Sequence, residues 1–373
     1  NVKRMTYLDY SATTPVIDEV MDSFIKASNF IGNPNSLHKL GREANNLIEA
    51  ATKQIASLLG VDRDEIIYTS GASEANNTVI KSMEIYKNRG CEIITTQLEH
   101  SSIYEPLKYM ESKGFRIKYV PLENGIVSIS ALEKMISDET VLVSISMVNS
   151  ETGIRQPIEE IGEVLKKYPK VMFHSDITQA VGKVPFSLEN VDFASFSAHK
   201  FFGIKGIGGL IKRKNINMEP LIHGGKSTTA FRSGTPPTAL IVSMAKALRL
   251  SYENMDEDIL RVKKLNERIR DSLSKYKDVY INSNEHSIPH ILNISILALK
   301  PETFMHSLEE NEVYVSTKSA CSSGDISGAV KAITLDDRRA YHSIRISISR
   351  ITSDKDIDEF LRAFSISYRK LEG

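Results

Sequence analysis

The spacing of apolar residues changes along the chain from a helical pattern to short β-rich runs. After the pair Thr14-Pro15, which suits the start of a helix, residues 17–30 are predicted to be helical. A second helix is predicted after Gly41, and Gly60 is placed to end it, because glycine readily adopts the left-handed conformation of a helix C-cap. The apolar face of this second helix is formed by Ala44, Leu47, Ile48, Ala51, Ile55, Leu58 and Leu59.

Short apolar runs then alternate with helical stretches as far as residue 211. The runs predicted to be strands are 66–69, 92–96, 117–120, 141–148, 171–175, 193–197 and 207–211. Such alternation favours a mostly parallel sheet covered by helices on both faces. Because ligands in these sheets lie at the carboxyl ends of strands, polar residues that directly follow a run are expected to converge: Gly71-Ala72-Ser73, His100, Asn149 and Asp176.

A long helical pattern from residue 237 to about residue 277 precedes a second group of elements. Strands are predicted near residues 291–296, 313–316 and 344–348, with a closing helix from about Asp354, which is typical of an α+β unit. The 373 residues exceed a typical single core. We therefore predict an α/β protein in which residues 15–255 form a large domain, and residues 1–14 and 256–373 form a smaller one.

The charge balance and the cysteine content exclude several classes of protein. Lys plus Arg and Asp plus Glu both number 47, so the electrostatic attraction required for DNA or for an anionic membrane surface is missing. The two cysteines, Cys91 and Cys321, are too far apart in sequence to suggest a disulfide framework or a zinc cluster, so no metal is expected. No apolar run approaches the roughly 20 residues that span a bilayer, and the first residues do not resemble a signal peptide. We expect a cytoplasmic protein.

Two polar tracts suggest a specific cofactor. The tract FHSDITQA (173–180) places Asp176 at the end of a predicted buried strand, and SFSAHKF (195–201) places Lys200 after the next strand. Pyridoxal 5′-phosphate requires a carboxylate beside its pyridine nitrogen and a lysine that holds its aldehyde as a Schiff base. Either residue alone would more often be an exposed charge. The neighbours Ser197 and His199 suit a phosphate, and Gln179 suits a phenolic oxygen, which favours the cofactor.

Three further segments have two possible interpretations each. The tract 69–74 lies between a strand and a helix and could bind phosphate, or it could be an ordinary turn with Ser73 as helix cap. His100 could stack on a cofactor ring and act as an acid or base, or it could be structural. Arg345, within an alternating strand pattern, could hold a substrate carboxylate or could lie at an exposed edge.

Cys321 lies in a stretch of small residues between a predicted strand and a predicted helix, in the sequence SACSSG (319–324). An exposed thiol in such a segment is a candidate nucleophile if its thiolate is stabilised. The alternative is a tolerated loop cysteine. Cys91, by contrast, begins a predicted strand after Gly90 and is most simply a small core residue.

With these tracts in order, the chain resembles the cysteine desulfurases of the NifS/IscS type. These belong to the class V aminotransferases, which are fold-type I pyridoxal-phosphate enzymes with an aspartate-aminotransferase-like fold. The resemblance spans nearly the whole length. It rests on the segments 7–15, 32–36, 69–74, 148–153, 173–180, 195–201, 232–235, 319–321 and the strand around Arg345.

This resemblance implies a role for each candidate residue. Lys200 would hold the cofactor, Asp176 would pair with its ring nitrogen, Gln179 would contact the ring oxygen and His100 would stack on the ring. The phosphate would be held by Ala72, Ser73, Ser197 and His199, with Thr235 supplied by the second copy in a homodimer. Asn149 would contact the cofactor and, with Arg345, the substrate carboxylate.

The implied reaction converts L-cysteine to L-alanine and leaves the sulfur on Cys321 as a persulfide. An acceptor protein for iron–sulfur cluster assembly or for tRNA or cofactor thiolation would then take the sulfur. The chain departs from the family pattern at Lys318, where glycine is usual, and in the segment 226–230. Alternatives are a selenocysteine lyase, another class V aminotransferase, or a cofactor-binding paralogue that serves mainly as an assembly partner.

Overall fold

The computed structural model describes residues 4–318 and 326–372. Its central element is a seven-stranded sheet in the order β2-β10-β9-β8-β7-β3-β4. All neighbouring strands pair in parallel except β10, which is antiparallel to both of its neighbours. The strands are β2 (Ile66–Thr69), β3 (Glu92–Thr95), β4 (Arg116–Tyr119), β7 (Thr140–Ser144), β8 (Met172–Asp176), β9 (Phe193–Ser197) and β10 (Gly208–Lys212). The predicted mostly parallel sheet is therefore confirmed, with all seven strands close to their predicted positions.

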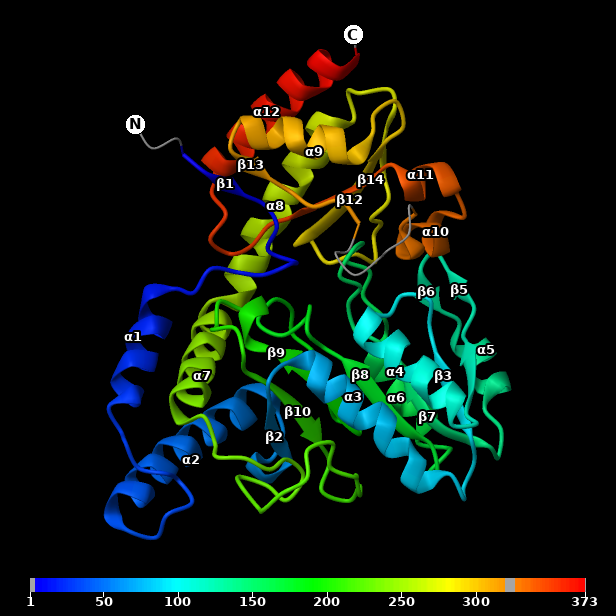
Figure 1. Cartoon of the computed structure of the whole chain (residues 1–373). Helices are drawn as coiled ribbons and strands as arrows, with labels where there is room; N and C mark the ends of the chain where they lie inside the picture. Colours follow the sequence, from blue (N-terminus) through cyan, green and yellow to red (C-terminus); the bar gives the residue numbers. More distant parts are fainter. Residues whose placement is uncertain (1–3, 319–325, 373) are drawn as a thin grey trace.

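Helices cover both faces of this sheet (Figure 1). They are α1 (Asp18–Ser28), α2 (Lys39–Leu59), α3 (Ala72–Ser82), α4 (Ser101–Ser112), α5 (Ile129–Met135), α6 (Ile158–Leu165) and α7 (Thr238–Glu253). Side chains of α2, α6 and α7 share one apolar core with the sheet, whereas those of α3 and α4 share another. Because successive strand residues point to opposite faces, Ile66 joins the first core and Ile67 the second.

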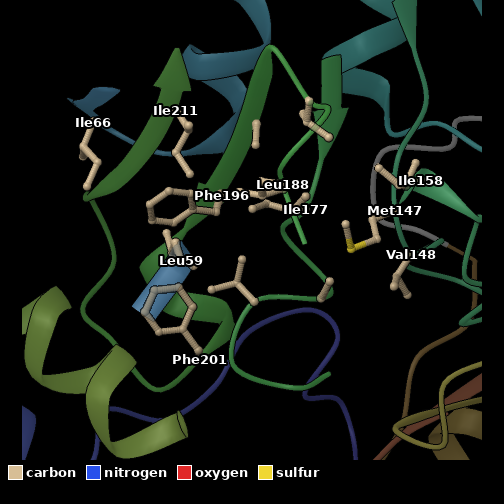
Figure 2. Packing of buried hydrophobic residues seen from close by; sticks show 14 of the residues in the cluster. Leu59, Ile66, Met147, Val148, Ile158, Ile177, Leu188, Phe196, Phe201 and Ile211 are labelled. Carbon is tan, nitrogen blue, oxygen red and sulfur yellow. The ribbon is translucent and has the colours of Figure 1, made fainter. Parts of the chain in front are cut away.

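The larger core surrounds aromatic side chains near the strand that leads to Lys200. Figure 2 shows Phe196 of β9 on the same side of the sheet as Ile211 of the adjacent strand β10 and Ile66 of β2, the strand beyond it, with Phe201 close by. Phe196 and Phe201 are both fully buried, and their rings lie 6.4 Å apart between centroids. This packing anchors both sides of the short 3-10 helix η3 (Ala198–Lys200), which holds the candidate lysine.

A second, smaller sheet lies beyond the carboxyl ends of the large one. It contains β11 (Val279–Ile281), β12 (Ile291–Ile296) and β14 (Ser343–Ser347), while β1 (Thr6–Tyr7) pairs separately with β13 (Val313–Tyr314). Around it lie α8 (Met255–Leu273), α9 (Pro301–Glu310), α10 (Gly328–Thr334), α11 (Asp337–Tyr341) and α12 (Asp354–Glu372). These elements have their own apolar core, which also includes Leu8 from the start of the chain. The proposed domain boundaries stay a prediction.

The predicted helix over residues 237–277 is two helices in the structure. Asn254, with φ −128° and ψ 35°, lies between α7 and α8 and interrupts the helical backbone. The sequence pattern did not reveal this break because apolar residues continue on both sides of it. The structure also contains a small hairpin of β5 (Leu122–Glu123) and β6 (Ile126–Val127), and the 3-10 helices η1 (Arg63–Glu65) and η2 (Met83–Tyr86).

Gly60 ends α2 in the left-handed conformation, with φ 68°, as predicted. The helix begins at Lys39 rather than after Gly41, because the His38 ring nitrogen Nδ1 accepts a hydrogen bond from the Gly41 amide and caps it. Across residues 4–318 and 326–372, none of the helices is both long enough and apolar enough to cross a bilayer.

Candidate active site

A cavity of about 560 Å³ lies at the carboxyl ends of the parallel strands. Its wall includes residues that follow β2, β3, β8 and β9, and it reaches β14 of the smaller sheet through Arg345. The volume is in the range of small-molecule sites. Of the predicted site residues it is lined by Ala72, Ser73, His100, Asp176, Gln179, Ser197, His199, Lys200 and Arg345. These residues, which are distant in sequence, therefore lie around one cavity, as the pattern of strand ends predicted.

Lys200 extends from η3 toward the first residues of the chain. Its amine Nζ donates hydrogen bonds to the carbonyl oxygens of Ser11, at 2.6 Å, and Ala12, at 2.7 Å. Ser11 is itself fixed, because its amide donates to Ser347 Oγ and its hydroxyl donates to the Ser150 carbonyl. Backbone carbonyls from the amino-terminal segment thus orient the amine into the cavity.

Asp176 ends β8 with both carboxylate oxygens accepting hydrogen bonds. Oδ1 accepts from the amide and hydroxyl of Thr178, at 3.0 and 2.5 Å, and Oδ2 accepts from Asn76 Nδ2 at 3.0 Å. All three partners are donors, so both oxygens are held in a fixed orientation. An oriented carboxylate is what a protonated pyridine nitrogen requires.

Asn76 connects Asp176 to His100. The second hydrogen of its Nδ2 is donated to Ser102 Oγ at 2.9 Å, and Ser102 Oγ lies 2.8 Å from His100 Nδ1. The Ser102 amide also donates to His100 Nδ1, so that nitrogen is an acceptor and the ring proton is on Nε2. Burial lowers the pKa of His100, and the nearby Lys200 lowers it further against the opposing charge of Asp176. His100 is therefore a neutral ring that caps α4 and faces the cavity.

The other end of the cavity suits a phosphate group. The first turn of α3 begins at Ala72, whose amide donates to Ser197 Oγ at 2.7 Å, and helix amino-terminal amides favour anions. His199 lies beside them, with Nδ1 3.0 Å from Thr13 Oγ1. Burial, with the charges of Lys200, Lys205 and Lys183, lowers the pKa of His199 to about 4, so the ring is neutral. Gly71, not Ser73, is the residue that precedes the helix as its cap.

The structure decides between the two interpretations of Arg345. Its side chain is about 5% exposed, and its Nη2 donates to Asp9 Oδ1 at 3.0 Å. Nη1 donates to the Ser150 carbonyl, while Nε is buried without a partner among the described residues. The exposed-edge alternative is therefore wrong. A buried guanidinium that lines the cavity can bind a substrate carboxylate.

Two predicted residues lie outside the cavity wall. The Asn149 amide oxygen accepts from the backbone of Glu151 and from the amide and hydroxyl of Thr152, while its nitrogen donates to the Leu98 carbonyl. Its side chain thus braces the loop whose neighbours Val148 and Ser150 line the cavity. Thr235 is exposed and does not line the cavity in the single chain. Cys321 lies outside the described residues.

Sequence reasoning missed several residues that the fold brings to the site. Asp9, Ser11, Thr178 and Lys205 line the cavity, and Asn76 contacts Asp176. Asn76 lies four residues after Ala72 in the same helix, so its position on one helical face was available from spacing. The carbonyl oxygens of Ser11 and Ala12 have no sequence signal, because every residue carries a carbonyl.

Comparison with known proteins agrees with this geometry. The family model for aminotransferase class-V matches residues 6–360. The chain belongs to this family. It is 39% identical to a cysteine desulfurase IscS of Glaesserella parasuis, covering 99% of this chain and 94% of that protein. A Dictyoglomus turgidum protein of the same name is 38% identical, with coverage of 99% and 96%.

Solved structures show the same resemblance. A NifS-like protein superposes with a TM-score of 0.93 at 37% identity, covering 99% of this chain and all of that one. The structure described as SspA in complex with cysteine gives a TM-score of 0.82 at 31% identity, covering 93% of this chain and all of that one. The fold-type I architecture predicted from the sequence is thereby confirmed.

Enzymes of this family depend on pyridoxal 5′-phosphate, and the residues present fit that group. The cavity contains an amine, a carboxylate at the end of β8, a flat neutral ring and a helix amino terminus. The backbone near the phosphate end is also closely packed: a Cβ on Gly208 would lie 2.4 Å from the Phe196 carbonyl and 2.7 Å from Gly71 Cα. These features together match the aldehyde, the ring nitrogen, the ring face and the phosphate.

Proposed function

We propose that this protein is a pyridoxal-phosphate-dependent cysteine desulfurase that converts L-cysteine to L-alanine and passes the sulfur to Cys321 as a persulfide. The observation that carries the proposal is the placement of Lys200, Asp176 and Arg345 on the wall of one cavity. An amine and a carboxylate suit the cofactor, and a buried guanidinium suits the carboxylate of an amino acid. The relatives named cysteine desulfurase, and the structural neighbour that binds cysteine, support this substrate.

Each residue has a defined task in this proposal. When bound, the cofactor supplies the electron sink that acidifies the substrate α-carbon. Asp176, held by Thr178 and Asn76, keeps a proton on the ring nitrogen. Lys200 Nζ would hold the aldehyde of the cofactor and, once freed, would take the α-proton of the substrate.

The remaining groups bind and orient. Arg345 binds the substrate carboxylate, with Asn149 bracing the neighbouring loop. His100 places its ring, with the proton on Nε2, over the cofactor face. The amides of Ala72 and Ser73 and the side chains of Ser197 and His199 bind the phosphate.

The sulfur-transfer step completes the reaction. The Cys321 thiolate attacks the sulfur of the bound cysteine, an S–S bond forms, and the carbon–sulfur bond breaks with its electron pair remaining on the alanine carbon. One proton then adds to that carbon, and the proton held by Lys200 returns to the α-carbon, which completes L-alanine. The persulfide passes to an acceptor protein in iron–sulfur cluster assembly or in thiolation of tRNA or a cofactor.

Assembly and location form part of the same proposal. A homodimer would bring Thr235 of a second copy to the phosphate, since in the single chain Thr235 is exposed and outside the cavity. Sedimentation of the purified protein tests the dimer, and a monomer with full activity would contradict it. We also propose a cytoplasmic location.

The decisive assay compares two cysteines. The protein incubated with L-cysteine and a reductant should release sulfide and alanine in equal amounts, and Cys321→Ala should abolish sulfide release while the cofactor colour stays. Cys91→Ala is the matched control, because Cys91 lies at the start of β3, away from the cavity, and should leave release unchanged. Sulfide release undiminished in Cys321→Ala, as expected for a selenocysteine lyase that does not need this cysteine, would overturn the assignment. Absence of sulfide release from the wild type, as expected for an aminotransferase, would overturn it as well.

A chemical test addresses the cofactor directly. Borohydride reduction followed by peptide mapping should place a phosphopyridoxyl group on Lys200. In a separate, unreduced sample, an intact-mass spectrum after cysteine treatment should show one added sulfur. Peptide mapping should locate this sulfur on the peptide that contains Cys321. A yellow protein without the sulfur adduct would instead support the assembly-partner alternative.

A further inference from the structure

Lys183 is a buried lysine next to the cofactor cavity that the proposed reaction does not use. It follows β8 in a tight turn in which the amides of Lys183 and Val184 both donate to the Ala180 carbonyl. Gly182 has φ +76°, and a Cβ there would lie 2.9 Å from the Cβ of Phe201. The turn is thus fixed by glycine and by packing, and it directs the Lys183 side chain inward rather than to solvent.

The amine of Lys183 contacts the side chain of Gln179. Nζ donates to Gln179 Oε1 at 2.7 Å, and Gln179 Nε2 donates to the Ser11 carbonyl at 3.0 Å. The same Ser11 carbonyl accepts from Lys200 Nζ at 2.6 Å. Lys183 and Lys200 are therefore connected through one amide and one carbonyl.

The direction of the Gln179 amide follows from the chemistry of its neighbour. A lysine ammonium can donate hydrogen bonds but cannot accept them. Below about pH 7, where Lys183 is an ammonium, Gln179 therefore turns its oxygen toward Lys183, and its N–H₂ donates to the Ser11 carbonyl at the cavity. Without this donor the amide could rotate, and its oxygen would then meet the Ser11 carbonyl and any anionic group in the cavity.

Lys183 is held in this position at an energetic cost. It is buried, and in the ranges 4–318 and 326–372 no carboxylate lies within 4.0 Å of its amine. Burial, with the charges of Lys200 and Arg345, lowers the pKa of Lys183 to about 7. Below about pH 7 the amine is an ammonium, and its hydrogen bond to Gln179 Oε1 offsets part of the cost of burial.

We propose that Lys183 is a positioning residue that fixes the amide of Gln179, so that Gln179 Nε2 is presented as a donor to the ring oxygen of the bound cofactor. This inference deepens the proposed function and rests on it, since the ring oxygen belongs to the cofactor. Lys183 itself touches neither cofactor nor substrate; it acts through Gln179.

The test uses a double-mutant cycle on cofactor-free protein titrated with pyridoxal 5′-phosphate. Lys183→Met and Gln179→Leu should each weaken binding about tenfold, and the double variant should bind no more weakly than Gln179→Leu alone. Lys183→Arg, which keeps a cationic donor, should restore most of the affinity. Lys212→Met is the matched control, because Lys212 is also buried but donates to Arg213 and Ile216 carbonyls, away from the cavity.

Two further measurements separate this inference from folding defects and from the function itself. Thermal unfolding of cofactor-free Lys183→Met checks that it folds. In the same cofactor-free protein, the side-chain N–H₂ resonances of Gln179 should shift relative to the wild type, and Lys183→Arg should reverse the shift. Unchanged Gln179 resonances, or fully additive binding defects, would overturn the role of Lys183. A wild type that does not bind the cofactor would instead contradict the proposed function, while the resonances would still report on the contact.

Discussion

Arg345 and Asp9 form an ion pair, 3.0 Å between Nη2 and Oδ1, that joins the last strand of the smaller sheet to the first residues of the chain. The guanidinium is almost fully buried, whereas the Asp9 side chain is about 24% exposed. A buried cation requires a counter-ion, and before substrate binds Asp9 fills that role. In the proposed function, the substrate carboxylate would therefore meet a guanidinium that Asp9 already orients and partly neutralises.

The first prediction concerns this pair. Asp9→Asn keeps the shape of the side chain but removes its charge, so the buried guanidinium loses its counter-ion. We expect the free energy of unfolding, measured by urea titration without substrate, to fall by about 1–3 kcal/mol. Glu359→Gln is the matched control, since its pair with Arg362 is exposed and should contribute less than about 1 kcal/mol. Equal losses in the two variants would contradict the buried role of the Asp9 pair.

The second prediction concerns the tautomer of His100. Its Nδ1 accepts from the amide and the hydroxyl of Ser102, so ¹⁵N shifts should place the proton on Nε2 in neutral solution. Ser102→Ala removes the hydroxyl partner of the neutral ring. The pKa of His100 should then rise toward its ordinary value. A proton found on Nδ1 in the wild type would rule out the arrangement.

The third prediction concerns Glu99, which lies fully buried between the ends of β3 and β7. Its carboxylate accepts from the amide and hydroxyl of Ser146 and from the Thr96 hydroxyl. Burial outweighs these bonds and raises the pKa of Glu99 from 4.5 to about 7. The folded protein therefore keeps this proton at pH values where the unfolded chain has lost it.

The sign of the pH effect follows from that difference. The contribution of Glu99 to stability is fully present below pH 4.5 and is lost as the pH rises to about 7. Relative to Glu99→Gln, the free energy of unfolding of the wild type should fall by about 1.4 kcal/mol for each pH unit in this interval. Urea titrations of both proteins at several pH values measure this difference in the free energy of unfolding. A difference between the two proteins that does not change with pH would contradict the raised pKa.

The fourth prediction concerns the phosphate end of the cavity. Gly208→Ala would place a Cβ 2.4 Å from the Phe196 carbonyl and 2.7 Å from Gly71 Cα, so the backbone must shift. We expect a loss of about 1–3 kcal/mol in unfolding free energy and weaker binding of pyridoxal 5′-phosphate. Gly225→Ala, which has open space around its Cβ, should change stability by less than about 0.5 kcal/mol. Unaltered cofactor affinity in Gly208→Ala would show that the close packing does not shape the site.

The regular elements were predictable where local pattern and tertiary role agree. The strands β2, β9 and β12 match their predicted residues, because each is a buried β-branched or aromatic run with polar or glycine boundaries. The break at Asn254 was not predictable, since the apolar pattern continues through it and the turn is set by the packing of α7 and α8 on different cores.

The candidate site also contains residues that the sequence identified and residues that it did not. Asp176 and Lys200 were identified because they occur together near two strand ends with Ser197, His199 and Gln179 as neighbours, whereas either charge alone would more often be exposed. Asn76 and Lys183 were missed because their tasks depend on partners 100 and 4 residues away, and the inward direction of Lys183 depends on a turn conformation. Whether Arg345 is buried or lies at an exposed edge could be decided only from the structure, in which Asp9 is its neighbour.

The turn around Ser11 joins parts of the chain that are distant in sequence. The Ser11 amide donates a hydrogen bond to Ser347, and the Ser11 hydroxyl donates one to the Ser150 carbonyl. The Ser11 carbonyl accepts from both Lys200 and Gln179. In the proposed function the cofactor takes the Lys200 amine, which would release its hydrogen bond to Ser11 and alter the restraint on residues 9–13. Amide hydrogen exchange in this turn should therefore differ between the cofactor-free and the loaded protein, which gives a readout of cofactor occupancy independent of colour.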